Sequence, residues 1–386
     1  MCIRDRYRLI FFRKEVIMYS LRREVLILAL AFGLPALCSS ANSVAIPLFF
    51  LSKGLSPFLI GVLYSLGYLI NSTMVYFFSA AGDAWGRRKS ITSLSLLYAV
   101  LVAIFYYAKI YYLFPIFFTF GKGGTITALL VEKAEDRTRA FSVASTTAIL
   151  LGVAGYLMTG FLPYSLVFQL EILVLLASAA LFASIREDYR GTGRLELGIP
   201  SIGKVSRFTF QWIIGFGAGL VLPLFSLWWH LRYDLNKEII SIISIISSVV
   251  VAGMLQLAPT IRQKFGGARS VAVMFSFQTL STVLMPFSPL VPIAISLYLI
   301  RNVLSNLTNP IILTMLTSSV SKEEIARADS FLDTINSYIR VAGPSVSGYL
   351  FSEGNLYLSF ELLGIIYTAS LMVFIYLFRK EIAKPS

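Results

Sequence analysis

Gly82-Asp83-Ala84-Trp85-Gly86-Arg87-Arg88-Lys89 is a short basic segment between two long apolar stretches. No charged residue occurs from Gly54 to Gly82 or from Ser90 to Ala108. A helix that crosses a bilayer needs about 20 apolar residues, so each stretch is long enough to do so. The segment is therefore expected to be a tight cytoplasmic loop between two membrane helices.

The composition of the whole chain is that of a polytopic membrane protein. Of its 386 residues, 57% are hydrophobic and 14% are charged, whereas soluble proteins carry about 25% charged residues. A net charge of +13 would suggest a nucleic-acid partner in a soluble chain. Here membrane orientation explains it, and no nucleic acid is expected. Cys2 and Cys38 have no metal-ligand spacing, and no metal or other cofactor is expected.

The hydropathy pattern predicts an all-α polytopic membrane protein with twelve transmembrane helices. The expected spans are 25–51, 57–81, 90–108, 111–131, 140–161, 165–185, 208–230, 239–261, 270–287, 292–318, 330–351 and 356–378. Loops on one side of these spans hold 26 of the 33 Lys and Arg residues, and loops on the other side hold four. Because basic loops stay in the cytoplasm, both termini are expected there, in a multi-pass protein of the plasma membrane.

The longest polar loop, 186–207, divides the spans into two sets of six. We expect an N-terminal bundle over 18–185, a cytoplasmic linker over 186–207 and a C-terminal bundle over 208–386. A faint repeat supports this division, since Trp85-Gly86 and Phe265-Gly266 occupy corresponding loops at an offset of 180 residues. Six-plus-six repeats are an architecture of secondary transporters, in which the substrate binds at the interface between the repeats.

The segment Gly82–Lys89 resembles the signature loop of the major facilitator superfamily, a Gly, then Asp, then Gly-Arg-Arg/Lys. Together with the helix number and the central loop, this resemblance covers nearly the whole chain. It implies a monomeric transporter with two pseudo-symmetric six-helix bundles, and a charged latch between them on the cytoplasmic side. The residues implicated in this latch are Asp83, Gly86, Arg87, Arg88, Arg139 and Arg327; the last two stand in loops that both end in Arg-Ala-x-Ser. The alternatives are that these residues only set orientation or form a solvated loop face.

The resemblance also implies a central cavity lined by spans one, four, seven and ten. The corresponding substrate-cavity candidates are Asn42, Lys122, Gln211, Trp212, Arg301, Asn302 and Asn306. Two cations in these spans favour an anionic or carboxylate-bearing substrate. The alternative is that Arg301 and the mid-span Arg340 are held in buried ion pairs with Asp333, Glu171 or Glu361.

Proton coupling requires a carboxylate that gains and loses a proton within the membrane. Asp333, Glu171 and Glu361 are the candidates. Glu171 and Glu361 lie near the outer ends of their spans, so they are also expected to reach the interface with water.

The leading hypothesis is a secondary transporter that works in the lipid bilayer by alternating access, coupled to protons, with a small organic anion as substrate. Multidrug or sugar efflux is the alternative within this class, although span five lacks the Gly-Pro typical of exporters. A transport-dead sensor or receptor on the same scaffold is an alternative of another class. An enzyme is disfavoured, because the chain has a single His and no nucleophile–base constellation.

Residues 1–17 form a basic extension before Met18, which resembles a more ordinary start of a transporter. The hypothesis is that this extension is not native; a disordered basic tail or a short interfacial helix is the alternative. We expect mass spectrometry of the native protein to find no peptide covering Arg8 to Arg13. Detection of that peptide would show that the extension is translated.

Overall fold

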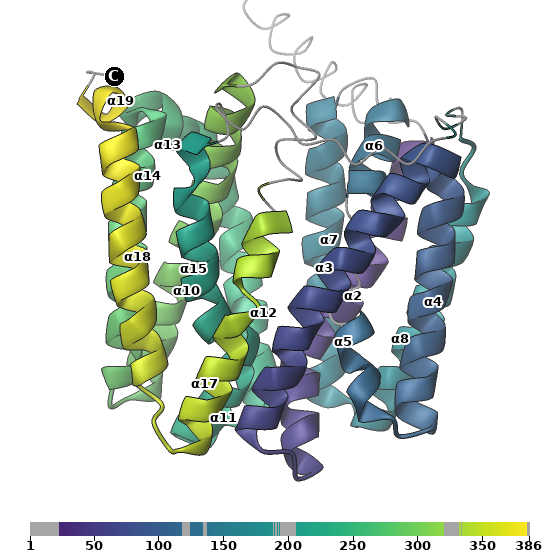
Figure 1. Ribbon diagram of the computed structural model, residues 1–386, viewed down its shortest axis with the longest axis horizontal. Helices are drawn as coiled ribbons and strands as arrows, with labels where there is room; N and C mark the ends of the chain where they lie inside the picture. Colours follow the sequence, from purple (N-terminus) through teal and green to yellow (C-terminus); the bar gives the residue numbers. More distant parts are fainter. Residues whose placement is uncertain are drawn as a thin grey trace, which may run out of the picture.

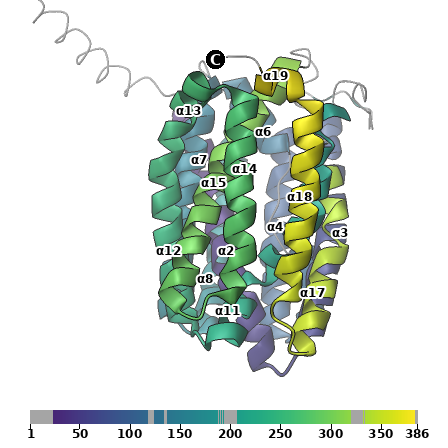
Figure 2. The same ribbon diagram turned by 90° about the vertical axis from the view of Figure 1, so that its left-hand side faces the viewer.

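The computed structural model describes residues 23–117, 124–133, 137–187, 189, 191, 193, 206–319, 332 and 334–383. These residues form two helical bundles, and the axes of the long helices are roughly aligned with one another, as those of membrane spans are (Figure 1; Figure 2). The helices of the first bundle are α2 (Arg23–Ser52), α3 (Pro57–Trp85), α4 (Arg87–Tyr107), α5 (Phe114–Phe117), α6 (Gly124–Lys133), α7 (Arg137–Phe161) and α8 (Tyr164–Ser184).

The second bundle begins after the segment that follows Ser184. Its helices are α10 (Phe210–Val221), α11 (Phe225–Tyr233), α12 (Lys237–Met254), α13 (Ala258–Phe265), α14 (Gly267–Leu284), α15 (Val291–Ser319), α17 (Ala342–Ser352), α18 (Leu358–Leu377) and α19 (Arg379–Ala383). Short 3-10 turns join α10 to α11 and α12 to α13, so that each pair lies in one continuous helical run.

The expected fold class is confirmed. Within the described residues, ten helical runs are long and apolar enough to cross a membrane. The other two expected spans are interrupted: the fourth is described as 111–117 and 124–133, and the eleventh breaks at Arg340 and Val341. Pro310 lies inside α15, which continues through it from Val291 to Ser319.

Local sequence sets the helix ends at the side of the molecule opposite the Gly82–Lys89 loop. We call the side with that loop the motif end and the other side the opposite end. The Ser56 hydroxyl accepts from the Leu59 N–H at 3.3 Å ahead of Pro57, which starts α3, and Asn236 caps α12 in the same way at 3.0 Å. A cap of this kind satisfies a backbone donor that the helix leaves free.

The two bundles touch backbone to backbone where α3 meets α17. A Cβ on Gly348 would overlap the carbonyl oxygen of Pro57, and a Cβ on Gly61 would overlap that of Pro344. One helical turn further into the membrane, the Ser345 hydroxyl and the Ser65 hydroxyl are 2.7 Å apart. Small residues at such crossings allow close helix packing in membranes.

A second contact between the bundles joins α7 to α12. The Lys237 ammonium donates to the carbonyl oxygens of Thr159 (3.1 Å) and Leu162 (2.5 Å) at the C-terminal end of α7. It also lies 5.2 Å from the centre of the Tyr164 ring. A cation at the C-terminus of a helix is stabilised by the free carbonyls and by the helix dipole. We call this contact the Lys237 clasp.

The described hydrogen bonds between the bundles lie between the opposite end and the middle of the membrane. Besides the two contacts above, Ser226 of α11 donates to the Ser43 carbonyl of α2 at 2.8 Å. The hydrogen bond nearest to the motif end joins the hydroxyls of Thr73 and Tyr338 at 3.0 Å. In Figure 1, α3 and the helix that leads into α17 diverge toward the motif end. Within the described residues, the opposite end of the molecule is therefore the closed one.

The closed end depends on the absence of a side chain at Gly348. We expect Gly348→Ala to reduce the population of this conformer roughly 5- to 150-fold, because overpacking costs about 1–3 kcal/mol. Electron–electron resonance distances between spin labels at Lys109 and Glu353, which are exposed in different bundles at this end, would lengthen.

Gly253→Ala is the matched control, since a Cβ there meets no atom within 4 Å. Equal label distances in the Gly348→Ala and Gly253→Ala variants would contradict the prediction.

Candidate functional site

Gly86 makes the sharp turn of the motif loop. It has a φ of +115°, which glycine adopts without strain, and it separates the end of α3 from the start of α4. A Cβ at this position would lie 3.3 Å from Oε2 of Glu187. The glycine therefore lets the chain reverse and also lets a carboxylate approach.

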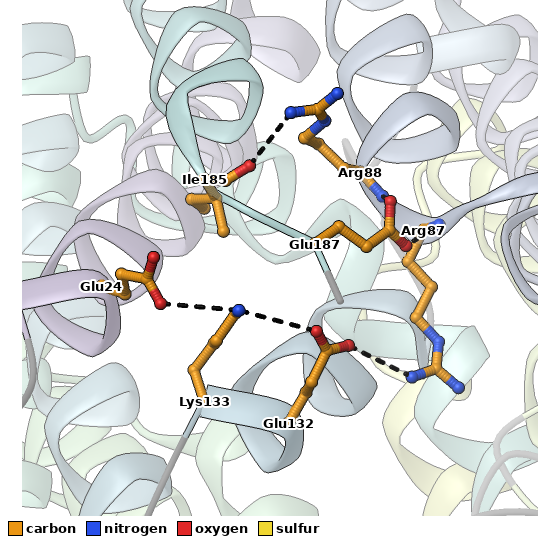
Figure 3. A network of polar contacts seen from close by, with 7 residues as sticks. All are labelled: Glu24, Arg87, Arg88, Glu132, Lys133, Ile185 and Glu187. Atoms are coloured by element: carbon orange, nitrogen blue, oxygen red, sulfur yellow. Dashed lines mark hydrogen bonds and ion pairs between the residues drawn. The ribbon is translucent and has the colours of Figure 1, made fainter. Parts of the chain in front are cut away.

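That carboxylate caps the N-terminus of α4 from outside the loop (Figure 3). The backbone N–H groups of Arg87 and Arg88 donate to Glu187 at 2.5 Å and 3.1 Å. The Arg88 guanidinium donates to the carbonyl oxygen of Ile185 at 3.3 Å. A helix N-terminus presents free N–H donors and the positive end of the dipole, so a carboxylate is a strong partner there.

Arg87 extends the network to two other helices of the first bundle. Its guanidinium lies 3.8 Å from the Glu132 carboxylate of α6 and 4.1 Å from the centre of the Tyr189 ring. Lys133 bridges Glu132 (3.7 Å) and Glu24 of α2 (3.6 Å), as Figure 3 shows. These contacts all join elements of one bundle, so they stiffen its motif end.

These contacts do not join the two bundles, so they do not form the expected latch. Asp83 lies in α3 and Arg139 in α7, but the side chains of both lie outside the described residues, as does all of Arg327. Gly86, Arg87 and Arg88 engage Glu187, which was not among the candidates. Glu187 is an acidic residue directly after span six, but nothing in the sequence points to the helix end that it caps.

Arg301 is buried in the second bundle, with 7% of its surface exposed. Its guanidinium donates to Oδ1 of Asn302 at 2.5 Å, and the Asn302 amide donates to the Ser247 hydroxyl of α12 at 2.8 Å. Asn306 donates to the Asn302 carbonyl oxygen at 2.8 Å. Nε of Arg301 has no hydrogen-bond partner, and no carboxylate of the described residues forms an ion pair with this side chain.

Arg340 stands at the break in span eleven. Pro344 has no N–H to donate to the Arg340 carbonyl, and Gly343 donates to it instead at 3.1 Å. The Arg340 side chain lies beside the hydroxyl of Tyr68 of α3, across the bundle interface. In the described part of the chain no acidic side chain pairs with Arg340, and Asp333 lies outside it.

The two described carboxylates within spans have different environments. Glu361 is exposed in the first turn of α18, beside Glu353 and Asn355. Glu171 of α8 is 0% exposed. The expectation that Glu171 reaches the interface is therefore wrong, because α8 turns this side chain inward, against α2.

The remaining cavity candidates do not form one cluster. Asn42 is 3% exposed and lies beside Glu171 within the first bundle. Gln211 and Trp212 are half-buried on α10, where Trp212 packs against the apolar core of the second bundle. Lys122 lies outside the described residues. No three His, Cys, Asp or Glu side chains of the described residues come together as metal ligands would.

Comparison with known proteins assigns the chain to a class. The family model described as Major Facilitator Superfamily matches residues 28–339. The protein is therefore a member of the major facilitator superfamily, with a transporter fold. A search of curated proteins found no match.

Solved structures agree with this fold. The nucleoside transporter NupG is 13% identical with a TM-score of 0.73, covering 93% of this chain and 100% of its own. A bacterial homologue of the human lysosomal transporter Spinster, inward-facing and occupied, is 15% identical with a TM-score of 0.74 over 94% and 98% of the two chains. The human organic anion transporter MFSD10 (TETRAN) is 13% identical with a TM-score of 0.68 over 92% and 100%.

The Glu187 cap gives a test of the motif-end network. We expect Glu187→Ala to lower the free energy of unfolding by about 1–2 kcal/mol, because two N–H donors of α4 lose their partner. The midpoint of thermal unfolding in detergent would fall accordingly. Glu353→Ala removes an exposed carboxylate and is the control; equal midpoints for the two variants would show that the cap does not stabilise the fold.

Proposed function

We propose that this protein is a secondary transporter that carries a small organic anion across the plasma membrane by alternating access, coupled to protons. Membership of the superfamily supports the transport mechanism. The excess of basic residues in the loops of the motif end supports a cytoplasmic position for that end. With this orientation, the structure is a conformer closed toward the outside.

The surroundings of Arg301 are the observation that supports the anion proposal. A cation inside a membrane protein is costly unless a partner of opposite charge or a polar cavity stabilises it. Arg301 has amide and hydroxyl groups around it, and within the described part of the chain it has no carboxylate partner. A guanidinium with a free N–H donor is suited to a carboxylate or phosphate group of a substrate.

Arg340 adds a second positive charge at a comparable depth. It lies at a helix break between α3 and α10, and discontinuous helices frequently form substrate sites in transporters. A Cβ on Gly219 of α10 would lie 2.8 Å from the Arg340 carbonyl, so the break is packed directly against span seven. One of the similar structures is a human organic anion transporter, but at 13% identity it supports only the fold.

The amide groups around Arg301 favour one second candidate. Asn302, Asn306 and Ser247 could bind the hydroxyl groups of a neutral sugar, with Arg301 serving to orient the amides. Sugar efflux then replaces anion transport. Neutral sugars and bulky organic cations therefore belong in the same binding test.

We expect small organic anions to raise the thermal unfolding midpoint of the purified protein, and Arg301→Ala to abolish this shift. At a ligand concentration of 100 times Kd, binding stabilises the folded state by about 2.7 kcal/mol. Arg262→Ala is the matched control, because Arg262 is exposed at the end of span eight. It should retain the full shift.

Arg301→Lys keeps the charge and covers the case in which the alanine variant does not fold. Stabilisation by anions that is unchanged in Arg301→Ala would overturn the anion site. Stabilisation by sugars alone would favour the second candidate.

A further inference from the structure

We propose that Glu171 and Asn42 form a proton-binding site inside the first bundle, separate from the anion site and loaded from the outer side. This inference rests on the proposed function, since it identifies the group that carries the coupled proton. Glu171 lies on α8 and Asn42 on α2, and their side chains lie next to each other in the core of the bundle. The two carboxylate oxygens of Glu171 make no fully formed hydrogen bond, and the amide nitrogen and oxygen of Asn42 make none either.

The pairing of these two groups favours a neutral carboxyl. A protonated carboxyl can donate to the amide oxygen while its other oxygen accepts from the amide nitrogen, so that both partners are satisfied. An ionised carboxylate can only accept, which leaves the amide oxygen facing a negative charge. A buried charge without a cation partner is strongly disfavoured in an apolar core.

No positive charge contacts Glu171 from the described helices packed around it. On α4, no charged residue occurs between Ser90 and Ala108, and on α2 none occurs between Glu24 and Lys53. Toward the outer side, Lys237 contacts Tyr164, seven residues or about 10 Å before Glu171 on α8. Charged residues at the motif end of the surrounding helices are Arg23 and Glu24 on α2, Arg87, Arg88 and Lys89 on α4, and Arg137 and Arg139 on α7. The other titratable and charged groups of the surrounding elements are Cys38 on α2 and Lys53 directly after it, Tyr98, Tyr106 and Tyr107 on α4, Tyr156 on α7, Tyr164 on α8, and Lys237 and Glu238 on α12.

The Glu171–Asn42 site is connected to the contact that closes the outer side. Thr159 of α7 donates from its hydroxyl to the carbonyl of Ala41, the neighbour of Asn42, at 3.1 Å. The Thr159 carbonyl in turn accepts from Lys237 of the second bundle at 3.1 Å. Thr159 therefore links the backbone beside the site to the Lys237 clasp.

α2 and α7 move together when the clasp opens. A Cβ on Gly155 of α7 would overlap the Leu37 carbonyl oxygen of α2, so these helices pack as one unit. Opening thus separates α7 from α12 and uncovers Thr159, Leu162 and Tyr164. Water then reaches Glu171 along α8, and the carboxyl exchanges its proton with the outer solution.

The direction of the coupling follows from this geometry. The neutral carboxyl fits the closed outer end seen here, whereas the ionised carboxylate is stabilised by water when the clasp is open. Acidification therefore favours the conformer closed to the outside, and alkaline pH favours the one open to it. For one proton, the ratio of the two conformers changes at most about tenfold per pH unit.

The test measures label distances between Lys109 and Glu353 positions in the full-length protein in lipid nanodiscs, from about pH 5 to pH 9, without substrate. In the wild type we expect the long-distance population to grow as pH rises. Glu171→Gln mimics the protonated form and should hold the short distance at every pH. Glu361→Gln makes the same change on an exposed carboxylate and should behave as the wild type.

Either of two results would overturn the proposal. The label distances of the wild type would not change with pH, or the Glu171→Gln variant would show the same pH response as the wild type. Should Glu171→Gln fail to fold, Asn42→Ala replaces it, and an unchanged pH midpoint in that variant would also refute the paired site. The anion test remains independent, because Glu171→Gln should retain the anion-dependent thermal shift. If the anion response is lost and the pH response remains, the anion proposal has failed. If the pH response is lost and the anion response remains, the proton-site proposal has failed.

Discussion

Direct backbone contact between α3 and α17 is the constraint on which the arrangement of the two bundles depends. Gly61 and Gly348 leave no room for a side chain, and Pro344 contributes its carbonyl to the same crossing. In a bilayer there is little hydrophobic force between helices, so this close van der Waals packing and a few polar contacts must hold the bundles together. Such an interface closes tightly, and it separates without leaving large apolar surfaces to hydrate.

The charges of the spans are accommodated by different means in the two bundles. Arg301 and Arg340 are surrounded by amide, hydroxyl and phenol groups, and Arg340 lies beside Tyr68 of the other bundle. Glu171 lies in an apolar core beside one amide. The first environment suits a ligand of opposite charge, and the second suits a group that loses its charge. Anion binding and proton binding would then occur at separate places, linked through the contact between the bundles.

The motif loop illustrates how a recognisable pattern can have a partner that only the fold provides. Gly86 and the two arginines identify the loop from the sequence. Glu187, 100 residues after Arg87, is placed at the start of α4 because α8 packs beside α4 and ends at the same level. The network around Glu132 and Lys133 depends on helix packing in the same way.

The sequence alone determined the membrane class, the twelve spans and the family, because uncharged stretches such as Gly54–Gly82 have no other stable environment and basic loops set orientation. It also located the candidate cations, since a charge within an apolar span is visible without coordinates. It did not separate Glu171 from Glu361: both lie near span ends, and only the rotation of each helix decides that one is buried and the other exposed. The Lys237 clasp and the Asn42–Glu171 pair were likewise decided by the tertiary structure, because they join residues 78 and 129 positions apart whose meeting depends on helix packing.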